Sequence, residues 1–171
     1  MIAPSAVTAL DPLPARAPAR ATRATVLAAL ADVADPEIPA ISIVDLGVVH
    51  AVEVDAGPAG AIRIELLPTF IGCPALDLIE STVVERMAAF GRPVEVEFVR
   101  SVPWTSERIS ATGRVALRRS GLAPPSDPAD VRCPYCDSGR VAMDSAFGPT
   151  QCRSLYYCRD CRQPFEAFKA V

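Results

Sequence analysis

The sequence predicts an α+β domain, a small mixed sheet with helices packed on one face, followed by a C-terminal ribbon-like module. Three observations support this fold class. Residues 48–98 hold three strand-like runs and one long helical pattern. Residues 123–128 are rich in proline and interrupt regular structure. Beyond them, four of the six cysteines occur as two Cys-x-x-Cys pairs. A proline separator between two different patterns indicates two folding units.

The first element is a helix that begins near residue 22. Val26 and Leu30 belong to an apolar pattern with helical spacing, and either Thr22 or Thr25 can cap it. We expect the helix to stop at Asp35-Pro36, because a residue before proline is disfavoured in the α region. The preceding residues 1–20 are rich in proline and alanine without apolar periodicity, and this predicts disorder.

Two strands and a hairpin follow. Residues 48–54 are rich in valine, and residues 62–66 alternate apolar and charged side chains. The turn-rich stretch 55–60 lies between them, so we expect a hairpin with a longer loop. Residues 94–98 alternate apolar residues with two glutamates and predict a third strand.

The clearest helix lies between the second and third strands. Its apolar residues recur every three or four positions from Leu76 to Phe90, and Gly91 is expected to end it. The order helix, strand, strand, helix, strand is typical of a compact α+β domain with helices on one sheet face. Residues 106–119 predict a final short helix.

The chain is therefore divided into four parts. We expect residues 1–20 to form a disordered N-terminal segment, 21–122 the α+β domain, 123–130 a linker and 131–171 the ribbon module.

The net charge is −3 and half of the residues are hydrophobic, which does not favour a general nucleic-acid or membrane-surface binder. The N-terminus lacks the pattern of a secretory signal, and no apolar run approaches a membrane span of about 20 residues. We therefore expect a cytoplasmic protein.

The two cysteine pairs predict a metal site. Cys133 and Cys136 are followed after twenty-one residues by Cys158 and Cys161. Such knuckles turn four sulfur atoms toward one ion, and four thiolates fill the tetrahedral shell of a structural zinc ion. An iron centre of the rubredoxin type and a redox dithiol are the alternatives. Three disulfides would also use six cysteines, but paired Cys-x-x-Cys motifs in a reducing compartment favour metal or redox sites.

Cys152 lies near this site without a Cys-x-x-Cys partner. It is either a small buried residue or a regulatory or transfer thiol.

Cys73 is the lone cysteine of the first domain. It lies between a strand end and a helix start, with Gly72 before it and Pro74 after it. Backbone amides at a helix N-terminus stabilise a thiolate, so we expect a lowered pKa there. The thiol could be a nucleophile, a metal ligand, a transient cluster ligand or an inert packed side chain. Asp35 and Glu37 could line a cleft with it or belong to a solvated loop.

Four segments of the first domain together resemble the iron-sulfur cluster assembly domain of the MIP-eighteen-like family. They are residues 35–39 (DPEIP), 42–49 (SIVDLGVV), 68–75 (PTFIGCPA) and 102–106 (VPWTS). The ribbon segments 147–152 (FGPTQC) and 161–169 (CRQPFEAFK) narrow the resemblance to accessory proteins of the bacterial phenylacetyl-CoA epoxidase system.

The resemblance implies a function that composition alone could not. It implies an accessory or maturation protein of the multicomponent phenylacetyl-CoA 1,2-epoxidase of aerobic phenylacetate catabolism. Such a protein helps to insert an iron-sulfur cluster or iron into the reductase or oxygenase subunits. The flavin/iron-sulfur reductase is the expected partner. Cys73 is the implied cluster-handling or iron-handling thiol, and Asp35 and Glu37 lie in the adjacent loop.

The sequence favours an accessory protein over an enzyme, since it carries no Gly-rich nucleotide loop, no Ser-His-Asp set and no carboxylate–histidine pairs for a di-iron centre. Three alternatives stay open. The chain could be a structural subunit of the oxygenase complex without a cluster-handling role. It could be a nucleic-acid-binding ribbon, which the mildly basic residues 131–171 support only weakly. It could also be a thiol oxidoreductase that uses a Cys-x-x-Cys pair.

Overall fold

The computed structural model describes residues 20–57 and 59–171. The predicted disordered segment, 1–20, lies outside the described residues except for Arg20. No helix among the described residues is long and apolar enough to cross a membrane. In chain order the elements are α1 (Arg23–Leu30), β1 (Val49–Val54), β2 (Ile62–Leu66), α2 (Leu76–Met87), the 3-10 helix η1 (Ala88–Phe90), β3 (Val94–Phe98), the 3-10 helix η2 (Ser106–Arg108), α3 (Ala111–Arg119), β4 (Leu122–Ala123), β5 (Val141–Ser145), β6 (Arg153–Cys158) and β7 (Pro164–Phe168).

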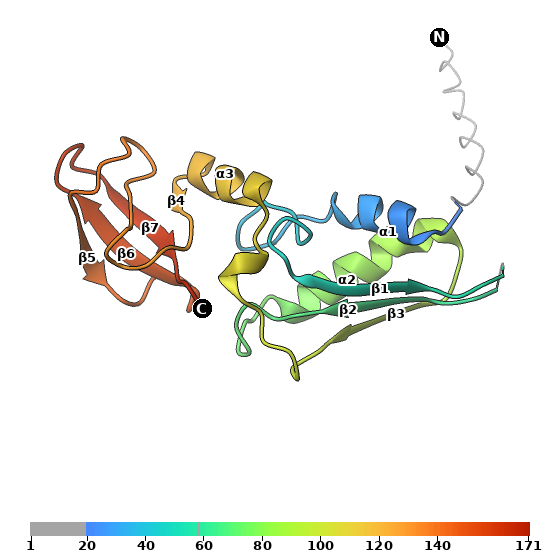
Figure 1. Ribbon diagram of the computed structural model, residues 1–171. Coiled ribbons are helices and arrows are strands. Elements are labelled where there is room, and N and C mark those ends of the chain that lie inside the picture. Colours follow the sequence, from blue (N-terminus) through green and yellow to red (C-terminus); the bar gives the residue numbers. More distant parts are fainter. Residues whose placement is uncertain (1–19, 58) are drawn as a thin grey trace, which may run out of the picture.

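The first sheet is mixed, and one of its faces is covered by helices, as the sequence predicts. Its strand order is β1-β2-β3, with β1 antiparallel and β3 parallel to β2. In β2 the apolar Ile62, Ile64 and Leu66 are buried, and the two charged residues between them are not. Figure 1 shows α1 and α2 together on one face of this sheet. The alternation in β2 therefore reflects one face against helices and one toward solvent.

Helix α1 begins where it was expected and ends earlier. The side chain of Thr22 accepts the backbone amide of Thr25, and the Thr25 side chain accepts the amide of Thr22, which makes a capping box. The helix ends at Leu30, well before Pro36. The backbone amide of Ile43 donates to the carbonyl of Val33 over 2.9 Å, so this part of the apolar pattern packs in a loop rather than in a helix.

Helix α2 follows the prediction closely. It is continued by η1, and Gly91 adopts the left-handed conformation with φ of 61°, which glycine tolerates without a steric cost. The predicted helix over 106–119 is split, because Ser110 has extended backbone and its side chain caps α3 by accepting the amide of Gly113.

The second sheet is the ribbon, with strand order β4-β7-β6-β5. β5, β6 and β7 form an antiparallel meander, and β4 adds to it parallel to β7. β4 directly follows α3, so regular structure of the ribbon sheet extends back to Leu122, at the border of the expected linker.

The two parts of the chain share a packed junction. The buried Trp104 donates its indole N–H to the carbonyl of Leu46 over 3.1 Å, and its ring lies 5.8 Å from that of Phe168 at the end of β7. The backbone amide of Ser106 donates to the carbonyl of Val171 over 3.1 Å. Phe168 belongs to the core cluster of the first domain. The ribbon is thus docked through its C-terminal end, which lies beside the first domain in Figure 1.

Candidate metal centre and thiol pocket

The four ribbon cysteines converge on one point. Their sulfur atoms all lie within 4.8 Å of one another. The Sγ atoms of Cys133 and Cys161 are 3.6 Å apart, and so are those of Cys136 and Cys158. A tetrahedral ion with Zn–S bonds of about 2.3 Å requires sulfur atoms roughly 3.8 Å apart. The donor set therefore fits a four-thiolate zinc site.

Both knuckles have the same local geometry. The residue after each second cysteine, Asp137 or Arg162, adopts a positive φ of 61° or 59°, which is uncommon for residues with a side chain. At the second knuckle the backbone amides of Cys161 and Asp160 help to lower the pKa of the Cys158 thiol to about 7. Burial raises the pKa of Cys161 to about 12. A cation held by all four sulfurs would offset that cost for Cys161.

Cys73 lies where the sequence placed it, in the loop between β2 and α2. Its backbone amide donates to the carbonyl of Phe70 over 3.1 Å, which closes a turn. Helix α2 begins at Leu76, so the thiol precedes the helix by a short turn. The side chain of Cys73 is partly exposed and packs against the core of the first domain.

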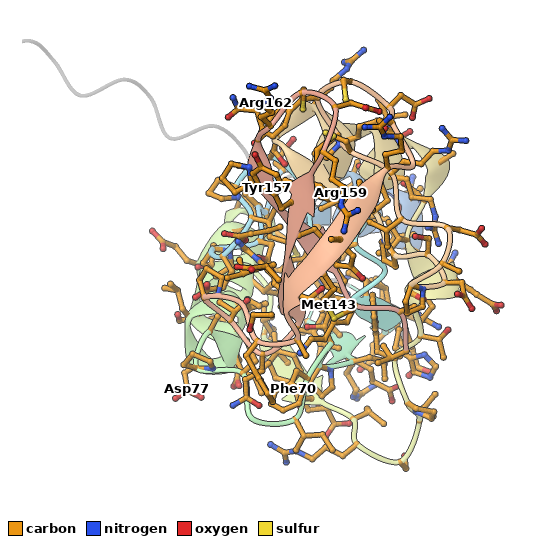
Figure 2. All side chains as sticks on the ribbon, turned by 90° about the vertical axis from the view of Figure 1, so that its left-hand side faces the viewer. Phe70, Asp77, Met143, Tyr157, Arg159 and Arg162 are labelled. Carbon is orange, nitrogen blue, oxygen red and sulfur yellow. The ribbon has the colours of Figure 1, made fainter. Side chains whose placement is uncertain are left out.

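The thiol of Cys73 opens into a pocket of about 250 Å³ between the two domains. The first domain contributes Glu37 and the loop around Cys73, and the ribbon contributes the turn 148–152 between β5 and β6. Figure 2, seen from the ribbon end, shows Phe70 of the first domain below the strand that carries Met143. The partly exposed Cys73 side chain is therefore reachable from this pocket.

The expectation of a lowered pKa for Cys73 is wrong. Burial raises the pKa of this thiol above its ordinary value of 9.0, and the nearby Asp35, Cys152 and Glu37 raise it further. Only the backbone amide of Ala75 acts in the opposite direction. The helix N-terminus would lower the pKa of Cys73, but this effect is smaller than the opposing ones. Partial burial and the acidic neighbours both disfavour the negatively charged thiolate.

Asp35 and Glu37 have different positions in the same loop. Asp35 is only 7% exposed, and its Oδ1 accepts the backbone amides of Glu37 over 2.9 Å and of Ile38 over 2.8 Å. Burial nevertheless raises the pKa of Asp35, and Glu37 adds to the effect. Glu37 is exposed and lines the pocket. Asp35 therefore shapes the loop, and Glu37 is the carboxylate that lines the pocket.

Two further polar residues, Asp45 and His50, do not line this pocket. The carboxylate of Asp45 accepts the hydroxyl of Ser110 over 2.5 Å and so ties its turn to the start of α3. His50 lies on β1, partly exposed, with its Nε2 atom 4.0 Å from a carboxylate oxygen of Glu65. It does not line the Cys73 pocket. The residue that sequence reasoning did not connect to this pocket is Cys152, since seventy-nine positions separate it from Cys73.

Comparisons with known proteins match both halves of the chain. A family described as iron-sulfur cluster assembly protein matches residues 23–98, and one described as PaaD zinc beta ribbon domain matches residues 120–169. A protein of Escherichia coli K12, named as a putative subunit of 1,2-phenylacetyl-CoA epoxidase, is 37% identical over 144 residues, which cover 80% of this chain and 86% of that protein.

Two further relatives resemble the first domain alone. The Fe-S protein maturation auxiliary factor YitW of Bacillus subtilis 168 is 32% identical over 84 residues, which cover 48% of this chain and 79% of YitW. The crystal structure of a domain of unknown function, DUF59, from Bacillus anthracis has a TM-score of 0.51 and 33% identity. The match covers 56% of this chain and 90% of that structure.

Fold and site together define a two-domain protein in which an iron-sulfur cluster assembly domain precedes a zinc beta ribbon. The similarity to the E. coli protein extends across both domains. The chain belongs to the PaaD family.

Proposed function

We propose that this protein is an accessory, non-catalytic maturation factor of a multicomponent phenylacetyl-CoA 1,2-epoxidase. It assists the insertion of an iron-sulfur cluster or iron into the reductase or oxygenase subunits, with the flavin/iron-sulfur reductase as the first candidate client. The name of the E. coli relative supports the epoxidase, and the name of YitW supports the maturation of iron-sulfur proteins. The two Cys-x-x-Cys pairs are typical of proteins in a reducing compartment, and we place this protein in the cytoplasm.

The observation that carries this proposal is the partly exposed Cys73 thiol in the pocket between the domains. Thiolate is the ligand type that iron-sulfur clusters require. A cysteine binds metal as the thiolate, so Cys73 must lose its proton when cargo binds, and its raised pKa makes that loss cost more. A positively charged iron ion would offset the repulsion from Asp35 and Glu37 that disfavours the thiolate. Asp35 and Glu37, which raise the pKa of the Cys73 thiol when no metal is bound, thus favour a cation beside it.

We assign a different task to the ribbon cysteines Cys133, Cys136, Cys158 and Cys161. When bound, zinc supplies a structural cross-link, since four protein ligands leave no coordination position for substrate. The ribbon residues hold the segment 148–152 against the first domain, so folding of the ribbon completes the pocket beside Cys73.

The test is delivery of a cluster to the reductase. The reductase is purified anaerobically from cells that lack this protein, and from cells complemented with wild type, Cys73→Ser or Leu78→Ser, and iron and acid-labile sulfide are assayed. Leu78 is a matched control because it lies on α2 and is 56% exposed outside the pocket. We expect the Cys73→Ser strain to yield cluster-poor reductase and the Leu78→Ser strain to match wild type. Full cluster content with Cys73→Ser would refute the role of the thiol.

A purely structural subunit of the oxygenase is the second candidate, and one observation favours it. Ile71 and Phe147 are 70% and 77% exposed. Exposed large apolar side chains are common in contact surfaces between proteins. Co-purification with the oxygenase chains at a fixed ratio, together with normal cluster content in the deletion strain, would favour this function over maturation.

A further inference from the structure

Cys73 shares its pocket with a second thiol that belongs to the other domain. Cys152 lies in the turn between β5 and β6, and both cysteines line the same cavity of about 250 Å³. Both side chains are partly exposed, and both pack against the same core cluster. The pocket therefore has one thiol from each domain, and it forms only where the ribbon packs against the first domain.

The turn that carries Cys152 is held firmly. The amide of Gly148 donates to the carbonyl of Arg153 over 3.0 Å, and the amide of Arg153 donates to the carbonyl of Thr150 over 3.1 Å. The amide of Lys169 on the C-terminal segment donates to the carbonyl of Cys152 over 2.9 Å. These bonds fix the backbone on both sides of the thiol, so its position is set by the ribbon fold.

The two walls of the pocket are also tied to each other. The guanidinium of Arg153 donates to Glu166 over 2.7 Å within the ribbon and to the backbone carbonyl of Glu37 over 2.5 Å in the first domain. The side chain of Arg153 is only 14% exposed. Arg153 adjoins Cys152, and Glu37 lines the same cavity as Cys73. One partly buried side chain thus holds the spacing between the loops that carry the two thiols.

The chemistry inside the pocket suits a soft metal cation. The two cysteine sulfurs in the pocket lining are the potential ligands, and the Thr150 hydroxyl lies 3.1 Å from the Sγ atom of Cys152. Sulfur ligands select iron in clusters, zinc and copper(I) over magnesium or calcium. A pocket of about 250 Å³ leaves room for an ion and its remaining ligands.

We propose that Cys73 and Cys152 together form a metal-handling site at the domain junction, one thiolate from each domain, which holds iron or a small iron-sulfur cluster in transit. The zinc ribbon then contributes a cargo ligand as well as a structural metal site. This inference rests on the proposed function for the identity of the cargo, but the pairing of the two thiols can be tested without a client protein.

The first test is anaerobic binding of Fe²⁺ to the full-length, zinc-loaded protein. Bound iron is measured after gel filtration, together with the thiolate-to-iron absorption, for wild type, Cys73→Ser, Cys152→Ser and the double variant. We expect each single variant to weaken Fe²⁺ binding by at least about tenfold, because loss of an outer-shell group alone costs 10–100-fold in metal affinity. Zinc content and the circular dichroism spectrum confirm that each variant is folded.

The outcomes separate this inference from the proposed function. If Cys73→Ser abolishes Fe²⁺ binding and reductase maturation while Cys152→Ser leaves both unchanged, the two-thiol site is refuted and the role of Cys73 stands. If both variants bind Fe²⁺ like wild type, the two-thiol site is also refuted. If both variants lose Fe²⁺ binding but the reductase matures normally, the site is supported and the proposed function fails.

A second test addresses the geometry directly. A short bis-electrophile that bridges two thiols is added to the native zinc-loaded protein, and the product is digested and mapped by mass spectrometry. We expect one bridge between the peptides that contain Cys73 and Cys152, and we expect bound Fe²⁺ to protect against it. Independent single modification of both thiols, with no bridged peptide, would overturn the proposal.

Thr150→Val should weaken Fe²⁺ binding more than Thr150→Ser, which keeps the hydroxyl beside Cys152.

Discussion

Removal of zinc from the ribbon should unfold residues 131–171. The first domain should stay folded but lose its contact with Phe168. The perturbation is a strong chelator, or Cys158→Ser at the buried end of the cluster. The buried cluster of the ribbon contains only three large apolar side chains, Val131, Tyr156 and Phe165. The first domain has a far larger core, to which Phe168 at the end of β7 also belongs.

The magnitude follows from these two cores. A structural zinc site contributes about 10–16 kcal/mol of binding free energy in comparable small modules. The whole unfolding free energy of a domain is about 5–15 kcal/mol. With three large buried side chains, the ribbon has no other source of comparable size. The first domain should survive, but it loses the burial of Phe168, and removal of a buried phenylalanine costs about 3–5 kcal/mol.

Trp104 provides the assay because it is the only tryptophan in the sequence. It is 5% exposed, and its ring lies beside Phe168. Chelation should therefore shift its emission to longer wavelength as β7 leaves. Limited proteolysis should cut within residues 131–171 and spare the first domain. Zinc added back should reverse both changes. A zinc-free protein with unchanged emission and a protease-resistant ribbon would refute the reasoning.

Three substitutions test other parts of the fold. Gly47→Ala should destabilise the protein by more than about 1 kcal/mol in urea unfolding, because φ is +75° and the new Cβ would lie 2.5 Å from the carbonyl oxygen of Arg108, whereas Gly139→Ala meets no atom within 4 Å and should have little effect. Thr22→Ala removes the capping box of α1 and should cost about 1 kcal/mol, and an unchanged thermal midpoint would contradict this. Asp35→Asn should stabilise the protein at pH 7 and not below pH 3.8: the pKa of Asp35 is raised in the folded state, so ionisation costs stability as the pH rises through that pKa, while asparagine can accept the same amides without charge. A stability difference that does not change between pH 3 and pH 7 would count against that explanation of Asp35.

Local sequence patterns were enough to predict most of the helices and strands. The residues that alternate in β2 and the apolar series from Leu76 to Phe90 specify their elements by periodicity, and the mixed sheet with helices on one face was predicted correctly. The end of α1 was not predicted, because the pairing of Val33 with Ile43 is a contact through a loop that no local pattern reveals. The addition of β4 to the ribbon was missed for the same reason, since a two-residue strand has no periodicity.

In the candidate site, too, local features could be predicted from the sequence and features that depend on tertiary packing could not. The spacing of the four ribbon cysteines is enough to predict their convergence, because each knuckle is local. The electrostatics of Cys73 could not be predicted in this way. Its position before α2 indicated a lowered pKa, but burial and the charges of Asp35 and Glu37 depend on tertiary packing and reverse the direction. The proximity of Cys152 depends on how the ribbon docks, which is fixed by contacts such as that of Trp104 with Phe168.

A raised pKa at Cys73 is compatible with a maturation role and adds a constraint to it. The thiolate is the form that reacts with oxidants, so a thiol held protonated is protected while it carries no cargo. In the proposed role, metal binding would remove the proton, and the cation would then compensate the charges of the surrounding carboxylates. Release to a client would return the proton to the sulfur and restore the resting state. The affinity for cargo is thereby limited by the cost of deprotonation, and a protein that must pass its iron on requires such a limit.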